Sequence, residues 1–467
     1  MNKANTRKLT IISIILSLAA GSLLLNNCFS PYQGDGTILT ITAPGNGSGY
    51  ARFLPELEIV DLVHTIRLHN GSGPDQEKTG IKAGQAESFN VTPGRWTITI
   101  EAFNVAGIKR AEASRTVTVN PGQNNPINLT MGPPSFGVNS WAELLAEIVS
   151  GDGPQIFILR PNNDDLTAWH ADSTINIDRE ITLVAEGDVT ILRDENNINF
   201  FTVSQSPAGT LTFGRPGGMA SKLTLDGNKG SFGGNTESLI SVSGYSDGFG
   251  GKLEMYGNII LTNNYAYRGG GVQVSGGTFN MHGGTISYNK AEHIGGGGYG
   301  GGVAVEGGIF FMSGGSIEYN EALQIGGGGV YVGATGSIVN FVMSGGTISD
   351  NTATQGSGVA LGFPGTPRFT MSGSARVNDE VYLTNGSGPT YRQIIVGGPF
   401  TNQPTGAVAY IRPETTTVGT KVLTNLDPSN DGEGILGNPN DLVFTNYYRF
   451  ELASGMTGGI DNKGLLE

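Results

Sequence analysis

The stretch Gly300–Ala322, GGGVAVEGGIFFMSGGSIEYNEA, decides the fold of this chain because its pattern occurs again on both sides. The preceding copy is Gly269–Ala291, GGGVQVSGGTFNMHGGTISYNKA. The following copy is Gly327–Ala353, GGGVYVGATGSIVNFVMSGGTISDNTA. Self-similarity at a fixed period is typical of proteins built from stacked structural repeats. A degenerate fourth copy keeps Val359, Phe369, Met371 and Asn378.

The spacing of the copies predicts a parallel β-helix. Met281, Met312, Met343 and Met371 are separated by 31, 31 and 28 residues. Each copy contains three short segments of alternating character, with glycine at the bends between them. Three strands and their bends make one triangular coil of a β-helix, in which successive coils stack about 4.8 Å apart.

The alternation also predicts which side chains face the inside of the coil. A phenylalanine and a methionine of each copy fall on the inner side of one strand, where identical side chains stack from coil to coil. An asparagine recurs at a bend, where its amide can hydrogen-bond along the stack. The predicted ladders are Phe279, Phe310, Phe341 and Phe369; Met281, Met312, Met343 and Met371; and Asn264, Asn289, Asn320 and Asn351.

Glycine is the most unusual feature of the composition, with 75 of 467 residues, about double the common share of about 7%. Collagen is excluded, because no strict Gly-X-Y triplet runs through the chain. A disordered polymer is disfavoured by the recurring Val, Ile, Leu and Phe, and a many-stranded antiparallel sandwich would need two-residue hairpin turns that the repeats lack. We therefore expect an all-β protein with a β-helix over residues 137–385.

The repeats resemble those of the pectin-lyase-like right-handed parallel β-helix proteins, and in particular those of polymorphic outer-membrane and adhesin-like surface proteins. The similarity covers about residues 137–385 and is strongest in Gly269–Ala353. It implies a right-handed solenoid. It implies no single activity, because such proteins include lyases, hydrolases and noncatalytic adhesins.

Residues 1–27 have the features of an export signal, since positive side chains precede the apolar run Leu9–Leu25. Leu25, three positions before Cys28, resembles the lipobox of bacterial lipoproteins, in which the cysteine is lipidated and becomes the mature N-terminus. A plain cleaved signal and an uncleaved membrane anchor are the alternatives. We expect an exported protein held by lipid, such as palmitate, on Cys28 in a bacterial envelope, at the outer membrane or cell surface, with a tether over 28–36.

Two further regions flank the β-helix. Residues 37–133 contain several runs of period two, with turns at Pro93-Gly94 and Pro121-Gly122, and predict a β-sandwich of immunoglobulin-like size. The tail over 386–467 is rich in Gly, Pro, Asn and Thr but includes strand-like runs, and we expect a β-rich C-terminal cap.

One amphipathic helix is predicted over 139–150, directly before the repeats. Ser140 and Glu143 have the spacing of a capping box. A helix at this place would cap the open end of the β-helix. Its apolar stripe consists of Trp141, Leu144, Leu145, Ile148 and Val149.

Charge and cysteine content exclude several partners. Lys and Arg number 27 against 40 Asp and Glu, a net charge of −13, so nucleic acid is disfavoured. The glycine runs Gly295–Gly298 and Gly300–Gly302 lack the Lys-Ser/Thr ending of a phosphate-binding loop, which disfavours nucleotides. A single cysteine can form neither an intramolecular disulfide nor a thiolate metal site. We expect no cofactor and no metal.

Candidate catalytic residues are sparse. Polysaccharide cleavage would need carboxylates clustered on one outer face, or calcium-binding acids with a basic residue. The five histidines are scattered singly, and His64 and His69 should lie on opposite faces of one strand. The sequence therefore predicts no catalytic residue. The charged residues of the repeats stand isolated: Glu254, Arg268, Glu306, Glu318, Glu321 and Asp350.

The outward positions of the strands offer a binding surface. Phe311, adjacent to Val342, would form an exposed apolar pair, and Tyr331 would lie outward on another face. Such aromatic platforms suit sugars or a partner protein, whereas packing beneath a glycine loop or the tail is the alternative. The two outward rows are Gln273, Ala304, Tyr331 and Ala360, and Asn280, Phe311, Val342 and Thr370.

We therefore expect a noncatalytic surface lipoprotein whose β-helix is a rigid stalk or an adhesin-like surface for glycans or a host or partner protein. A polysaccharide lyase or hydrolase of the pectin-lyase-like fold is the alternative, and a purely structural envelope protein is a third.

Overall fold

The computed structural model describes residues 37–45, 61–122, 126–161, 168–244, 249–293, 298–333, 338–362, 366–385, 392–401, 406–425, 450–460 and 465–467. The predicted signal, Cys28 and the tether lie outside the described residues. The described structure is almost entirely β, as predicted, with α3 (Trp141–Ser150) as its one α-helix. The chain divides into an N-terminal unit, Met1–Pro134, and a C-terminal unit, Ser135–Glu467.

The N-terminal unit contains two antiparallel sheets that contribute to one apolar core. Alternation is visible in β5, where Trp96, Ile98 and Ile100 are buried and the residues between them face outward. The predicted opposite orientation of His64 and His69 is confirmed, because His64 is buried and His69 is exposed. The sheets are β1 (Thr37–Thr42) with β4 (Ala86–Val91), and β3 (Gln76–Lys82), β2 (Val63–His69), β5 (Gly94–Phe103) and β6 (Lys109–Val119) in that order.

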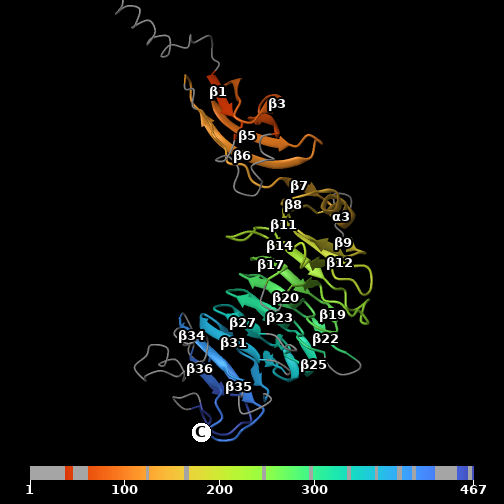
Figure 1. The fold of residues 1–467 in the computed structure, drawn as a ribbon, viewed down its shortest axis with the longest axis vertical. Helices are drawn as coiled ribbons and strands as arrows, with labels where there is room; N and C mark the ends of the chain where they lie inside the picture. Colours follow the sequence, from red (N-terminus) through yellow and green to blue (C-terminus); the bar gives the residue numbers. More distant parts are fainter. Residues whose placement is uncertain are drawn as a thin grey trace, which may run out of the picture. The chain divides into compact units, whose positions relative to one another are not determined.

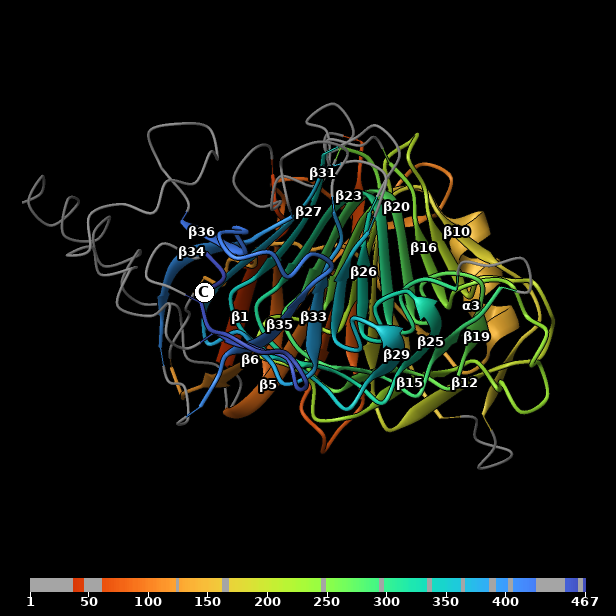
Figure 2. The same cartoon turned by 90° about the horizontal axis from the view of Figure 1, so that it is seen from below.

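The C-terminal unit is built from long stacks of parallel strands, compatible with a parallel β-helix. Figure 1 shows β11, β14, β17, β20 and β23 following one another along the unit. Figure 2 shows β20 and β23 on one side, with β12 and β15 on another. The chain visits each stack once per repeat, so residues about 31 positions apart become neighbours, as for Phe279 and Phe310.

The first stack of strands contains β10 (Ile175–Ile177), β13 (Phe201–Val203), β16 (Ile240–Val242), the first part of β20 (Val272–Met281), the first part of β23 (Val303–Met312), β26 (Val330–Val332), β30 (Val359–Leu361), β33 (Glu380–Leu383), β35 (Ala409–Pro413) and β37 (Phe450–Leu452). The second contains β7 (Ser135–Val138), β8 (Gln155–Leu159), β11 (Glu180–Ala185), β14 (Thr210–Phe213), β17 (Lys252–Met255), the second parts of β20 and β23, β27 (Ile338–Met343), β31 (Thr366–Gly373), β34 (Ile394–Phe400) and β36 (Leu423–Asn425).

The third stack contains β9 (Trp169–Ala171), β12 (Val189–Arg193), β15 (Leu223–Asp226), β18 (Ile259–Thr262), β21 (Thr285–Ser287), β24 (Ser316–Glu318), β28 (Thr347–Ser349) and β32 (Arg376–Val377). A short fourth stack contains β19 (Tyr265–Ala266), β22 (Lys290–Ala291), β25 (Glu321–Ile325) and β29 (Thr352–Gln355). All of these pairings are parallel.

The inner side of the second stack carries the predicted apolar ladders. The rings of Phe279, Phe310, Phe341 and Phe369 are fully buried and stack face to face, with successive centroids 4.7 Å apart. Met281, Met312, Met343 and Met371 are fully buried in register beside them. This spacing matches the distance between neighbouring strands, so each ring is in van der Waals contact with the next.

Glycine fits the bends for two physical reasons. Gly300 has φ +65°, and a Cβ there would lie 2.2 Å from the carbonyl oxygen of Val303. Gly315 has φ +86°, and a Cβ there would lie 2.5 Å from the carbonyl oxygen of Gly284 in the neighbouring coil. Both positions need a backbone conformation and a close approach that side chains prevent.

Helix α3 begins with the predicted capping interactions. The hydroxyl of Ser140 accepts the N–H of Glu143 at 3.2 Å, and the Glu143 carboxylate accepts the N–H of Asn139 at 2.8 Å. Trp141 is buried, and its ring meets the Phe201 ring edge-on at 5.3 Å. The predicted stripe was too wide, because Val149 is 76% exposed at the solvent side of the last turn.

The parallel stacks continue beyond residue 385, into the region for which the sequence predicts a β-rich C-terminal cap. Strand β34 pairs in parallel with β31, and β35 pairs in parallel with β33. The final pairing of this kind joins β35 to β37, Phe450–Leu452. The repeat signature fades before the architecture ends, because backbone pairing needs only extended, alternating segments and not the glycine and phenylalanine motif.

Candidate functional site

An outward surface that includes an exposed aromatic ring lies on the second stack. Glu254, Asn280, Phe311 and Val342 occupy matching positions in β17, β20, β23 and β27, and we call them the Phe311 column. Phe311 is 40% exposed and Val342 is half-buried. The structure therefore places the predicted apolar pair side by side on the outside of the stack, among polar neighbours.

Glu254 is the charged centre of this surface. Its carboxylate contacts Lys252 Nζ at 2.6 Å and accepts Asn280 Nδ2 at 2.8 Å, while its second oxygen lies 2.8 Å from His282 Nε2. Burial alone would raise the pKa of Glu254, but the hydrogen bonds from Lys252, Asn280 and His282, together with the charge of Lys252, lower it overall. The carboxylate is thus held ionised.

His282 links Glu254 to a serine in the next coil. Its Nδ1 lies 3.2 Å from the hydroxyl of Ser313, and its ring stacks on Tyr256 with centroids 4.6 Å apart. In the neutral imidazole, Nε2 carries the proton toward the carboxylate, since an ionised carboxylate only accepts. Nδ1 is then the acceptor for the Ser313 hydroxyl. Glu254, His282 and Ser313 form a hydrogen-bonded chain across three coils.

This chain corrects the expectation that charges and histidines stand isolated. Glu254 directly precedes Met255, which pairs in register with Met281. His282 follows Met281 and Ser313 follows Met312, so the register of the coils brings the three polar side chains together. A second pair forms on the first stack, where Arg268 Nη1 contacts Glu306 and Gln273 Nε2 donates to the same carboxylate. Only His282 and Ser313 are one 31-residue period apart, whereas Glu254–His282, Gln273–Glu306 and Arg268–Glu306 join residues 28, 33 and 38 positions apart, so the register of the coils is needed to find both groups.

Tyr331 does not have the exposed position that the sequence predicted. It lies outward on β26 but is only 5% exposed. In the register it stands between Ala304 and Ala360, whose small side chains leave room for the ring to lie against the sheet. The Tyr299 ring stacks on it at 4.5 Å, and burial raises the pKa of Tyr331 to about 12. Tyr331 is therefore part of a covered aromatic layer.

The asparagine ladder is a continuous buried hydrogen-bond chain. The Nδ2 of Asn289 donates to Asn320 Oδ1, and the Nδ2 of Asn320 donates to Asn351 Oδ1, both at 3.0 Å. The same oxygens accept the backbone N–H of the preceding asparagine, and Asn264 joins through its N–H to Asn289 Oδ1 at 3.1 Å. These amides accept hydrogen bonds from backbone N–H groups at the bend, which have no partner in the pairing of the strands.

Opposite charges stand at the two ends of the ladder. Arg193 Nη2 donates to Asn264 Oδ1 at 3.1 Å, and burial lowers the pKa of Arg193 to about 10. At the other end, Asp379 accepts the Nδ2 and the N–H of Asn351, both at 2.9 Å. The amide dipoles point their N–H ends toward the carboxylate, so both charges complement the ladder.

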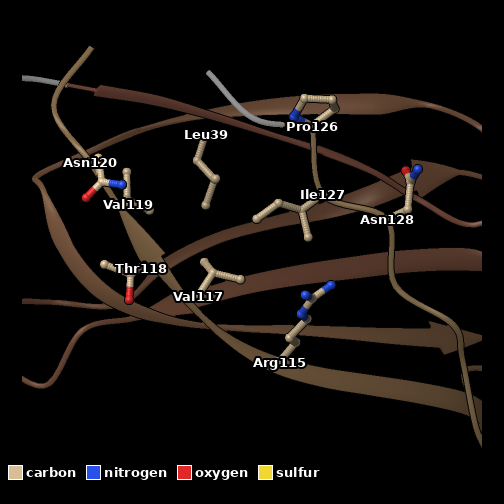
Figure 3. Close-up of a pocket in the computed structure, with 9 residues that line it drawn as sticks. All are labelled: Leu39, Arg115, Val117, Thr118, Val119, Asn120, Pro126, Ile127 and Asn128. Carbon is tan, nitrogen blue, oxygen red and sulfur yellow. The ribbon is translucent and has the colours of Figure 1, made fainter. Parts of the chain in front are cut away.

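The N-terminal unit contains a separate pocket of about 250 Å³. Figure 3 shows Leu39, Val117 and Ile127 pointing toward one another in it, with Arg115 at its side. It lies between β1 and β6 at the edge of the apolar core. The remaining lining residues are Thr118, Val119, Asn120, Pro126 and Asn128.

No helix in the part of the chain that the structure describes is long and apolar enough to cross a membrane. No group of three or more His, Cys, Asp or Glu side chains there is arranged to hold a metal ion. The lipid attachment predicted at Cys28 stays a prediction.

Comparison with known proteins found no matching family model, no matching curated protein and no matching solved structure.

Proposed function

We propose that this protein is a noncatalytic, lipid-anchored surface protein of a bacterial envelope, whose C-terminal unit presents an adhesin-like surface to a glycan or partner protein. The observation that carries the proposal is the Phe311 column. Phe311 is exposed on a rigid strand, with Val342 on one side and the hydrogen-bonding groups of Asn280 and Glu254 on the other. An aromatic ring held among polar groups is typical of binding surfaces.

The finer architecture is part of this proposal. We infer a right-handed coil, because crossovers between parallel strands are right-handed in the great majority of proteins. Helix α3 packs Trp141 against Phe200 and Phe201, which supports a capping role at the first coils. The shared core of the two N-terminal sheets supports an immunoglobulin-like sandwich that acts as a spacer.

The test of the binding surface is a glycan and matrix-protein array probed with Phe311→Ser. We expect the variant to lose the ligands that the wild type binds, because the exposed ring is removed while its buried neighbours stay in place. Val149→Ser is the matched control, since it removes an exposed apolar side chain from the solvent side of α3. Unchanged binding by Phe311→Ser would contradict the proposal.

The lipid anchor has its own test. Cys28→Ala should move the protein from the membrane fraction to the soluble fraction, because the only thiol for acylation is lost. Metabolic labelling with an alkyne fatty acid should mark the wild type and not the variant. Retention of the variant in the membrane would favour an uncleaved anchor.

A second candidate function, hydrolysis of polysaccharide-linked groups, is favoured by the chain Glu254–His282–Ser313. In such a site Ser313 would be the nucleophile, His282 the base and Glu254 the group that orients the base. Ser313 stands at an exposed position rather than in an enclosed site, which is why the noncatalytic function leads.

A fluorophosphonate probe separates these two functions. Covalent labelling of Ser313 that disappears in His282→Ala would establish an activated serine and overturn the noncatalytic proposal. Absence of labelling, together with no reducing-sugar or unsaturated product from a polysaccharide panel, would remove the enzyme alternative.

A further inference from the structure

A pair of exposed tyrosines lies on another side of the coil. Tyr288 follows β21 and Tyr319 follows β24, so both lie at the end of the third stack, whereas the Phe311 column lies on the second stack. They are 54% and 47% exposed. Their rings stack in parallel, with centroids 5.1 Å apart and an interplanar angle of 7°. We call this pair the tyrosine ridge.

The backbone at the ridge is unfavourable for tyrosine. Tyr288 has φ +57° and Tyr319 has φ +55°, in the left-handed region that bulky residues avoid. The same bend holds Asn263 in the preceding coil and Asp350 in the following coil, with φ +57° and +58°. Asn and Asp tolerate this conformation much better. Local backbone preference therefore does not explain the two tyrosines, and neither does burial.

The side chains beside the ridge define its chemistry. Asp350 lies in the coil after Tyr319 and raises the pKa of the Tyr319 hydroxyl through its negative charge. Lys229 follows β15, two coils before Tyr288, and its Nζ donates to the carbonyl oxygen of Tyr288, which ties the first bend to that earlier coil. The Tyr288 ring, in the preceding coil, stacks on one face of the Tyr319 ring. The open face of Tyr319 is thus on the side of Asp350, whose side chain is shorter.

We propose that the tyrosine ridge is a second binding site, for an uncharged sugar chain, in which one sugar ring stacks on the open face of Tyr319 and its hydroxyls donate to Asp350. A carboxylate accepts hydrogen bonds and donates none, so the ligand must carry donors. Asp350 and Glu318 repel polyanions such as nucleic acid or polyuronate. A ring held by stacking loses little conformational freedom when a ligand binds. The site goes beyond the function proposed for the Phe311 column.

Isothermal titration calorimetry with the full chain tests the ridge. The probes are cellohexaose, maltohexaose and chitohexaose as uncharged chains, with hexagalacturonate as the acidic comparison. We expect binding of at least one uncharged chain and none of the acidic chain. Tyr319→Asn should weaken that binding by about tenfold or more, which is typical of truncating a central aromatic contact.

Two further variants separate the ring from its surroundings. Tyr319→Phe keeps the ring and should retain most of the affinity, whereas Asp350→Asn should weaken binding by about fivefold, because a charge-assisted hydrogen bond becomes a neutral one. Tyr319→Asn should melt at the same temperature as the wild type or higher, since Asn suits the bend. Loss of binding through unfolding would therefore be recognised.

The proposal is overturned if no uncharged chain binds, if hexagalacturonate binds equally well, or if Tyr319→Asn binds like the wild type. The two binding proposals fail separately. Loss confined to Tyr319→Asn supports the tyrosine ridge alone, and loss confined to Phe311→Ser supports the Phe311 column alone.

Discussion

The inner and outer sides of the same strands follow different rules in this protein. On the inner side of β20, β23 and β27, Phe279, Phe310 and Phe341 are identical and fully buried. On the outer side, one residue further along, Asn280, Phe311 and Val342 all differ. On the inner side, side chains stack at the spacing of neighbouring strands, and identical side chains pack best at that distance. The outer side faces solvent, so its residues can vary and can include groups that bind a ligand.

The outer side itself is not uniform. Phe311 stays exposed, whereas Tyr331 on the neighbouring stack is covered by Tyr299 and lies between two alanines. An outward direction therefore does not make a residue available to a ligand. The neighbours in adjacent coils decide which aromatic rings face solvent.

The largest expected effect comes from truncating one ladder ring. Phe310→Ala should lower the free energy of unfolding by about 3–5 kcal/mol, because it leaves a cavity between two stacked rings. The neighbouring Phe311→Ala should cost less than about 1 kcal/mol, since that ring is partly in solvent. Urea denaturation of both variants measures the difference. Equal losses would contradict the distinction between the inner and outer sides.

A smaller loss is expected from the polar ladder. Asn320→Ala should cost about 2–3 kcal/mol, because the buried N–H and Nδ2 groups of Asn289 lose their acceptor. The control Asn378→Ala removes an exposed amide that accepts Arg376 Nε at 2.6 Å, and it should cost under about 1 kcal/mol. Thermal melting monitored by circular dichroism compares the two. A tolerated Asn320→Ala would show that the ladder is dispensable.

Replacing Tyr331 tests whether an outward aromatic ring that neighbouring coils cover contributes to stability. Tyr331→Ala should lower the free energy of unfolding by about 2 kcal/mol, because an apolar ring is removed from a buried layer. This loss should exceed that of Phe311→Ala in the same denaturation experiment. The reverse order would mean that Tyr299 and Tyr382 do not cover the ring in solution.

The smallest expected effect concerns pH. Burial raises the pKa of Asp379, partly opposed by hydrogen bonds from Asn351 and Asp350. A carboxyl group whose pKa is raised in the folded state contributes stability below its unfolded pKa, and that stability is lost as pH rises through the folded value. The stability of the wild type should therefore decline relative to Asp379→Asn as pH rises through that window. Urea denaturation at a series of pH values checks this, and a constant difference would contradict it.

The ladders could be predicted because the same residue type recurs at a nearly constant period, and the β class could be predicted because short segments alternate between apolar and polar residues. The groups at Glu254 and at the tyrosine ridge were missed for a different reason. Glu254, His282 and Ser313 belong to different residue types and are 28 and 31 residues apart, so no motif links them. Only the register between coils brings Glu254, His282 and Ser313 into hydrogen-bond contact. The tyrosine pair had one signal, the repeated Tyr-Asn at 288–289 and 319–320.

The sequence by itself determined the inner side of this protein, because the alternation and the 31-residue period specify which phenylalanine, methionine and asparagine side chains meet in the described coils. The tertiary structure alone decided the outer side. Whether Phe311, Tyr319 or Tyr331 faces solvent depends on the size of the residues in the coils before and after, and that contact exists only after the coils have stacked.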